Sequence, residues 1–94
     1  MEFAKPSEGF TIYSKSGCPY CIKAKTLLNG ETLTVIDCDP YLINTKDAFL
    51  EFIKELSNKD HKTFPMIFKN DTFIGGYSDL LNYLKEDWDN EKEN

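Results

Sequence analysis

Two cysteines separated by two residues, Cys18-Pro-Tyr-Cys21, are the feature of this sequence best suited to chemistry. They follow a β-rich segment directly and open a segment with helical spacing of apolar residues. The nucleophile in thiol–disulfide exchange is the thiolate, and a free thiol with a pKa of about 8.5 is mostly protonated at neutral pH. A helix N-terminus carries roughly half a positive charge and unpaired N–H groups, which stabilise an anion. We therefore expect Cys18 to be a redox nucleophile, with the cation of Lys15 close by.

Cys21 lies one helical turn after Cys18, so the two sulfur atoms can reach each other. It can attack a mixed disulfide formed at Cys18, and we expect it to be the more buried, resolving thiol. Pro19 suits the first helical position, where its missing N–H would have no helical partner. A metal-binding or merely packed pair is the alternative. Structural zinc usually takes four ligands, and only Cys38 and His61 remain, without the usual local spacing.

The elements that must position this pair follow from the hydrophobic pattern. Strand-like segments are residues 10–14, 33–38, 66–69 and 72–74. Segments with helical spacing are residues 19–28, 44–58 and 78–84. Asn70-Asp71 between the last two strands predicts a hairpin. The resulting order, β-α-β-α-β-β-α, predicts an α/β sandwich with a mixed sheet.

Element ends are also predicted from single residues. Asp39-Pro40 is expected to break the second strand, and Asn44 and Ser78 are expected to be N-caps of the second and third helices. The inner face of the last helix is expected to consist of Leu80, Leu81 and Leu84.

The net charge is −5 without a basic stripe, which argues against nucleic acid or anionic membrane as a partner. No apolar run approaches the length of a membrane span, and the N-terminus lacks a signal-type apolar stretch. Three cysteines, an odd number, do not suit a disulfide-stapled secreted scaffold. We therefore expect a cytoplasmic protein with a single domain over residues 1–94 and a core at about 10–84. A loose polar lead-in and a solvated acidic end, residues 85–94, are expected to flank the core.

Three motifs occur in order: Cys18-Pro-Tyr-Cys21, Thr63-Phe-Pro65 and Gly75-Gly-Tyr-Ser-Asp-Leu80. Together they resemble the glutaredoxin family in its dithiol form, over nearly the whole predicted core. The resemblance implies the thioredoxin fold, in agreement with the predicted order of elements. It also implies glutathione as reductant and co-substrate, with no metal and no tightly bound cofactor.

The Thr63-Phe64-Pro65 segment resembles the family's Thr-Val-Pro, in which a cis proline faces the active cysteine. The resemblance therefore implies a cis Pro65, with Thr63 and Phe64 in the glutathione site and the Phe64 backbone pairing with the bound thiol peptide. Phe64 departs from the family's valine, and its larger side chain would either reshape the groove or pack in the core.

The Gly76-Tyr77-Ser78-Asp79 segment resembles the family's element for recognising the γ-glutamyl group. A helix N-terminus here would offer N–H groups to a carboxylate, and Asp79 would bind the α-ammonium. Gly76 would let the backbone approach closely. A simple hairpin exit with an N-cap at Ser78 is the alternative, and both descriptions can hold together.

Lys15 and Lys62 match family positions for cations that bind the glycyl carboxylate of glutathione, and Tyr20 matches a tyrosine that borders the groove. Lys62 stands where arginine is frequent, so a bidentate clamp is lost. Plain surface lysines and a partly buried tyrosine are the alternatives.

The resemblance implies a monomeric oxidoreductase that reduces protein disulfides and protein–glutathione mixed disulfides, with ribonucleotide reductase as one candidate substrate class. Rival functions are a redoxin reduced by a flavoprotein reductase, an iron–sulfur or zinc module, and a non-catalytic adaptor. Pro19 argues against the cluster-bridging form, because family members of that kind usually lack proline at this position.

Three further residues receive no chemical role. Cys38 ends the second predicted strand and is expected to be a small buried side chain. His61 is expected to be a surface histidine, and Trp88 to pack against or cap the acidic end.

Overall fold

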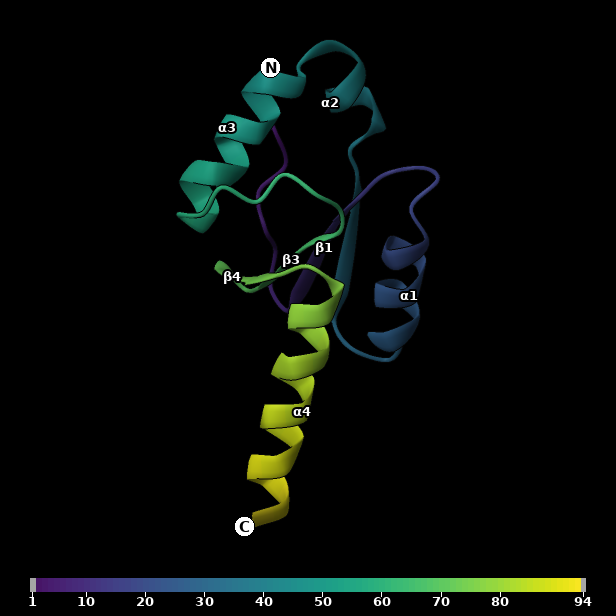
Figure 1. The fold of residues 1–94 in the computed structure, drawn as a ribbon, viewed down its shortest axis with the longest axis vertical. Coiled ribbons are helices and arrows are strands. Elements are labelled where there is room, and N and C mark those ends of the chain that lie inside the picture. Colours follow the sequence, from purple (N-terminus) through teal and green to yellow (C-terminus); the bar gives the residue numbers. More distant parts are fainter. Residues whose placement is uncertain (1, 94) are drawn as a thin grey trace.

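The computed structural model describes the backbone of residues 2–93 and the side chains of residues 2–86. Helices surround one mixed sheet (Figure 1). In chain order the elements are β1 (Phe10–Ser14), α1 (Pro19–Leu27), β2 (Leu33–Asp37), α2 (Asp39–Asn44), α3 (Lys46–Ser57), β3 (Met66–Lys69), β4 (Thr72–Gly75) and α4 (Tyr77–Glu93). The predicted α/β thioredoxin fold is confirmed, with one additional short helix, α2.

The sheet has the strand order β2-β1-β3-β4, which places β1 in its interior. β1 runs parallel to β2 and antiparallel to β3, and β3 pairs antiparallel with β4. The parallel pair is connected through α1, as a crossover requires. The predicted hairpin is present, and Asn70 adopts the positive φ, 53°, that a two-residue turn favours.

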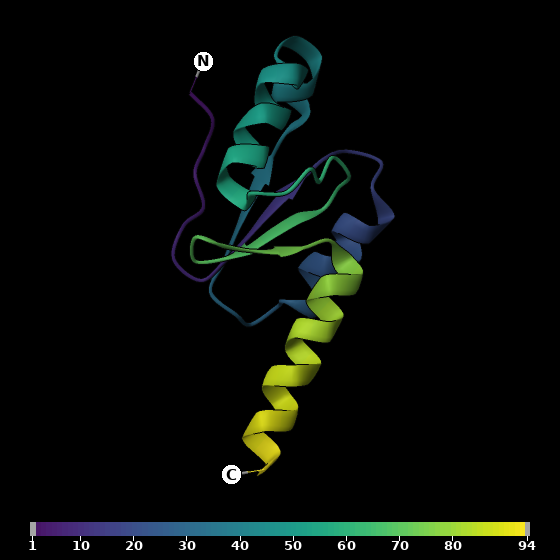
Figure 2. The ribbon, with the colours of Figure 1, turned by 60° about the vertical axis from the view of Figure 1, so that its left-hand side comes forward.

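Side chains of alternate strand residues build two cores, one on each face of the sheet. One core lies between the sheet and helices α1 and α4, and consists of Phe10, Ile12, Ala24, Leu28, Ile67 and Leu80. The other lies under α3 and consists of Tyr13, Cys38, Phe49, Ile53, Met66 and Phe68. Figure 2 shows α3 on one side of the sheet and α1 with α4 on the other. Both faces of β1 are therefore buried.

The break expected at Asp39-Pro40 is confirmed, since β2 ends at Asp37. The same two residues also begin α2, which was not predicted, because proline is well tolerated in the first turn of a helix. The two predicted N-caps are wrong. Asn44 is the last residue of α2, and Thr45 stands before α3 instead. Ser78 lies inside the first turn of α4, which begins at Tyr77.

The last helix also differs from the prediction on its inner face. Leu80 is fully buried and Leu84 packs against the same core, but Leu81 is 42% exposed. The backbone of α4 runs well beyond the edge of the sheet (Figures 1 and 2). The side chains of the acidic end from Asp87 onward, including Trp88, lie outside the described residues. None of the helices that the structure describes is long and apolar enough to cross a bilayer.

The N-terminal segment is not the loose lead-in that its polarity predicts. The Phe3 ring contacts Tyr41, Phe49 and Phe52 at centroid distances of 4.9, 5.6 and 5.3 Å. The Tyr13 hydroxyl donates to the Ala4 carbonyl at 2.7 Å. Phe3 therefore covers one end of the core under α3.

Replacing Phe3 by alanine should lower the free energy of unfolding by about 2 kcal/mol, the lower end of the range for large-to-small changes because the ring is half-buried. Urea unfolding followed by circular dichroism measures this. Lys5→Ala, a change at an exposed residue of the same segment, is the matched control and should leave the midpoint in place. Equal midpoints for Phe3→Ala and the wild type would show that the segment contributes nothing.

Candidate active site

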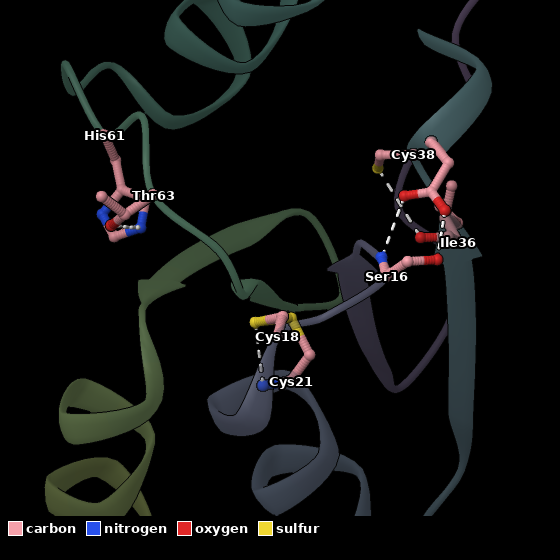
Figure 3. Close-up of a disulfide and its surroundings, with 8 residues drawn as sticks. Ser16, Cys18, Cys21, Ile36, Cys38, His61 and Thr63 are labelled. Carbon is pink, nitrogen blue, oxygen red and sulfur yellow. Dashed lines mark hydrogen bonds between the residues drawn. A yellow bond between two sulfur atoms is a disulfide. The ribbon is translucent and has the colours of Figure 1, made fainter. Parts of the chain in front are cut away.

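The cysteine pair lies where β1 ends and α1 begins. Cys18 is the N-cap of α1 with an extended backbone, φ −115° and ψ 97°, and Pro19 occupies the first turn. The backbone N–H of Cys21 donates to the Cys18 Sγ at 3.2 Å. The two sulfurs form a disulfide across a Cα–Cα distance of 5.3 Å (Figure 3). One sulfur thus stands at the positive end of a helix, as the motif predicts.

The two cysteines differ in their access to solvent. Cys18 is 7% exposed, whereas Cys21 is 1% exposed and packs inside the first turn. The expectation that Cys21 is the more buried sulfur is therefore confirmed. Of the two sulfurs, that of Cys18 is therefore the more accessible to solvent.

The loop before Cys18 is anchored by a carboxylate from α2. The Ser16 backbone N–H donates to Asp39 Oδ1 at 2.9 Å, and the Ser16 hydroxyl donates to Asp39 Oδ2. These two bonds, with a smaller effect of Lys15, hold the pKa of Asp39 below its ordinary value. Gly17 follows with a φ of 67°, a conformation that favours glycine. The loop that carries Cys18 is thus tied to an element that the sequence did not predict.

A cis peptide bond joins Phe64 to Pro65 directly before β3, as the resemblance implies. The Phe64 ring is half-buried and stacks on Phe49 with an interplanar angle of 6°. The Lys15 Nζ lies 5.6 Å from the centre of the same ring. The Phe64 ring therefore packs on the core under α3, as one of the two alternatives expects, and Phe64 is also a lining residue of the groove.

The groove has a volume of about 330 Å³ and is built from three chain segments. Its lining residues are Tyr20, His61, Thr63, Phe64, Pro65, Gly76, Tyr77, Ser78 and Asp79. The Tyr20 and Tyr77 rings lie 5.6 Å apart, and Tyr20 is 55% exposed. The groove therefore lies where the first turn of α1, the cis-proline segment and the N-terminus of α4 meet.

The N-terminus of α4 is shaped by two glycines. The Gly76 N–H donates to Asp79 Oδ2 at 2.9 Å, which fixes the carboxylate at the end of the groove. Gly75 has a φ of 129°, and a Cβ at this position would collide with the same carboxylate. Glycine is therefore required at position 75 both by the backbone and by the place of Asp79.

Comparison with known proteins identifies the family. The glutaredoxin family model matches residues 10–74. The chain belongs to the glutaredoxin family. Glutaredoxin 1 of Rickettsia bellii is 40% identical over 76 residues, which cover 80% of this chain and 76% of the relative. As a glutaredoxin with a dithiol motif, the protein is a glutathione-dependent thiol–disulfide oxidoreductase.

Solved structures agree with this assignment. Reduced glutaredoxin from Escherichia coli has a TM-score of 0.65 and 31% identity, over 86% of this chain and 98% of that one. A buckwheat glutaredoxin–glutathione complex has a TM-score of 0.68 at 23% identity, over 82% and 68%. The second likeness shows the shared fold.

In this glutaredoxin the two lysines expected at the site lie outside the groove lining. The Lys62 Nζ is 3.7 Å from Asp60 Oδ1, and both side chains are exposed. Lys62 borders a separate hollow beside α3. Lys15 is exposed, and its Nζ lies over the ring of Phe64, which is a lining residue.

His61 is the lining residue that the sequence interpretation missed. It is half-buried at the surface, and its ring packs edge-on against Phe73 at 5.2 Å, so the expected surface position holds but the side chain is not free in solvent. Figure 3 shows His61 beside Thr63 on the loop before β3. The available signal was its position two residues before Thr63, within the segment that forms one wall of the groove.

Cys38 is fully buried, as expected, at the end of β2. Burial raises the pKa of its thiol from 9.0 to about 12, and the nearby Asp37 and Asp39 add to the rise. Burial also raises the pKa of Tyr13 in the same core. The Cys38 thiol is therefore protonated at neutral pH, as suits a small side chain buried in the core.

We expect Cys38 to resist iodoacetamide at pH 8 in the reduced, folded protein, because a thiol with a pKa near 12 carries almost no thiolate there. Mass spectrometry of the Cys38 peptide, with and without urea, measures this. Modification should require urea, and equal rates in both conditions would contradict the assignment.

The same raised pKa predicts a loss of stability at high pH. Because the folded state holds the Cys38 proton more tightly, its contribution is complete below about pH 9 and declines as the pH rises towards 12. The free energy of unfolding of the wild type should therefore fall more steeply above pH 9 than that of Cys38→Ala. Parallel curves for the two proteins would contradict this linkage.

Proposed function

We propose that Cys18 is the nucleophile and Cys21 the resolving thiol in the reduction of protein–glutathione mixed disulfides and protein disulfides. The observation that carries this proposal is the place of Cys18 Sγ, at the N-terminus of α1 with the Cys21 N–H directed at it. Tyr20, two residues later, is already part of the groove lining. A sulfur that becomes anionic at this point faces a site of suitable size for a tripeptide thiol.

For a mixed disulfide, the Cys18 thiolate attacks the glutathione sulfur. The protein thiolate leaves and takes a proton from solvent, so that Cys18 carries the glutathionyl group. The thiolate of a second glutathione then attacks the glutathionyl sulfur. This step releases glutathione disulfide and restores the Cys18 thiolate, and it does not involve Cys21.

For a protein disulfide, Cys18 attacks one sulfur of the substrate and releases the other as a thiol. Cys21 then attacks the Cys18 sulfur, which releases the reduced protein and closes the Cys18–Cys21 disulfide. Two glutathione molecules reopen that disulfide and leave as glutathione disulfide. Cys21 can take this role because it lies one helical turn away and is shielded from other reactants.

The groove supplies contacts for each part of the glutathionyl group. The backbone of Phe64, before the cis proline, would pair with the cysteinyl backbone, and Asp79 would bind the α-ammonium. N–H groups at the start of α4, near Ser78, favour a carboxylate. Lys15 is the cation placed to attract the glycyl carboxylate. The glutathione complex of the buckwheat protein, which has the same fold, supports this use of the groove.

Disulfide-bonded and glutathionylated proteins are the proposed partners, with ribonucleotide reductase as one class. We propose that the protein acts as a monomer in the cytoplasm, because glutathione keeps thiols reduced there. The acidic net charge of −5 supports partners other than nucleic acid.

The two cysteines should separate the two reactions. Cys18→Ser should abolish the reduction of both substrate types, because no nucleophile remains. Cys21→Ser should keep activity towards a glutathione mixed disulfide and lose activity towards a protein disulfide. A coupled assay with glutathione and glutathione reductase measures both, and Cys38→Ala serves as the matched cysteine control. Equal loss in the two active-site variants would refute the proposed division of roles. Turnover with thioredoxin reductase but not with glutathione would refute the proposal that glutathione is the reductant.

The two lysines should contribute unequally. Lys15→Ala should raise the KM for a glutathione mixed disulfide several-fold, at about 1 kcal/mol for an exposed ionic contact. Lys62→Ala should have a smaller effect, because its side chain lies outside the groove and near Asp60. Steady-state kinetics at low and physiological ionic strength compares the variants. A larger increase in KM for Lys62→Ala than for Lys15→Ala would show that Lys62, not Lys15, is the cation that attracts the glycyl carboxylate.

A further inference from the structure

One basic side chain in the groove is not used by the mechanism above. Among the lining residues that the structure describes, Asp79 is the acid and His61 is the only basic residue. The lysines expected to meet the carboxylates of glutathione lie outside this lining. Glutathione carries two carboxylates and one ammonium, so a donor side chain in the groove would add to the backbone N–H groups at the start of α4 in binding a carboxylate.

The position of His61 selects one end of the groove. Its Cε1 and Nε2 atoms lie 3.5 and 3.9 Å from the point where a Cβ on Gly76 would sit, so this edge of the ring faces the Gly76 backbone. The Gly76 N–H in turn holds the Asp79 carboxylate. His61 and Asp79 therefore both lie close to Gly76, at the same part of the groove.

The His61 ring is held in place by packing, but its Nε2 has only a long contact to Thr63, so a ligand atom could replace that partner. Phe73 packs against the ring at 5.2 Å. The contact between Nε2 and Thr63 Oγ1 is 3.4 Å, longer than the usual 2.7–3.2 Å of a hydrogen bond to nitrogen. A carboxylate oxygen entering the groove would offer Nε2–H a stronger, charge-assisted partner.

We propose that His61 is a specificity-determining residue whose Nε2–H binds the α-carboxylate of the γ-glutamyl group. This inference rests on the proposed function. If Asp79 binds the α-ammonium, the carboxylate on the same carbon atom must lie within a few ångströms of that ammonium. The His61 ring lies beside Gly76, the residue whose N–H holds the Asp79 carboxylate. His61 would bind the α-carboxylate and Asp79 the α-ammonium, so the pair would recognise the amino-acid end of glutathione.

The test uses two substrates that differ only in the γ-glutamyl group: the mixed disulfides of 2-mercaptoethanol with glutathione and with cysteinylglycine. His61→Phe keeps an aromatic ring against Phe73 but removes the donor. It should raise the KM for the glutathione substrate about tenfold, the size expected for losing a hydrogen bond to a charged group. Its kcat, and its KM for the cysteinylglycine substrate, should remain at the wild-type values. His61→Gln keeps a donor and should restore most of the lost affinity.

Lys59→Ala is the matched control, because Lys59 is exposed on the same loop and lies outside the groove lining. An unchanged KM of His61→Phe for the glutathione substrate would overturn the inference. Equal increases in KM for both substrates would also overturn it, since they would indicate only a distorted groove. In either case an active wild type would leave the proposed function intact. A wild type inactive towards both substrates would instead remove the proposed function, and the inference with it.

Discussion

Cys18 belongs to two structures at once, since it ends the loop after β1 and caps α1. The helix provides aligned N–H groups that stabilise a thiolate, while the buried strand β1 holds the start of the Cys18 loop in place. The antiparallel register pairs Tyr13 with Met66, the residue after Pro65. The end of β1 and the cis proline therefore lie at the same edge of the sheet. This shared edge brings the reactive sulfur and the groove together.

The groove is made from segments that are far apart in the sequence, and each contributes a different kind of contact. Tyr20 comes with the helix that carries the cysteines, and Thr63 to Pro65 offer backbone groups before β3. The start of α4 contributes N–H groups and the fixed carboxylate of Asp79. Such a mixture of backbone donors and a few placed charges suits a small, charged ligand, which is the basis for proposing glutathione as the occupant of the groove.

Supports outside the groove keep the catalytic loop and the cores in place. The Asp39 carboxylate holds Ser16, and so anchors the loop before Cys18 to α2. Phe3 closes the core under α3, where Tyr13 and Cys38 are buried. Burial raises the pKa of both groups, so both keep their protons in this core at neutral pH.

Local sequence determined the chemistry and most of the element order. Cys18-Pro-Tyr-Cys21 between a strand and a helix predicts a redox pair, because helix position and thiol spacing act over one turn. The hairpin at Asn70 was predictable for the same reason. Helix α2, the packing of Phe3 and the place of His61 were not, because each depends on contacts with residues far along the chain. The local preferences of Pro40 are the same whether it only ends a strand or also begins a helix. The polarity of His61 is likewise the same whether it is exposed on the surface or lines a groove. Only the folded chain decides between such alternatives, because packing adds free energy that local preferences do not contain.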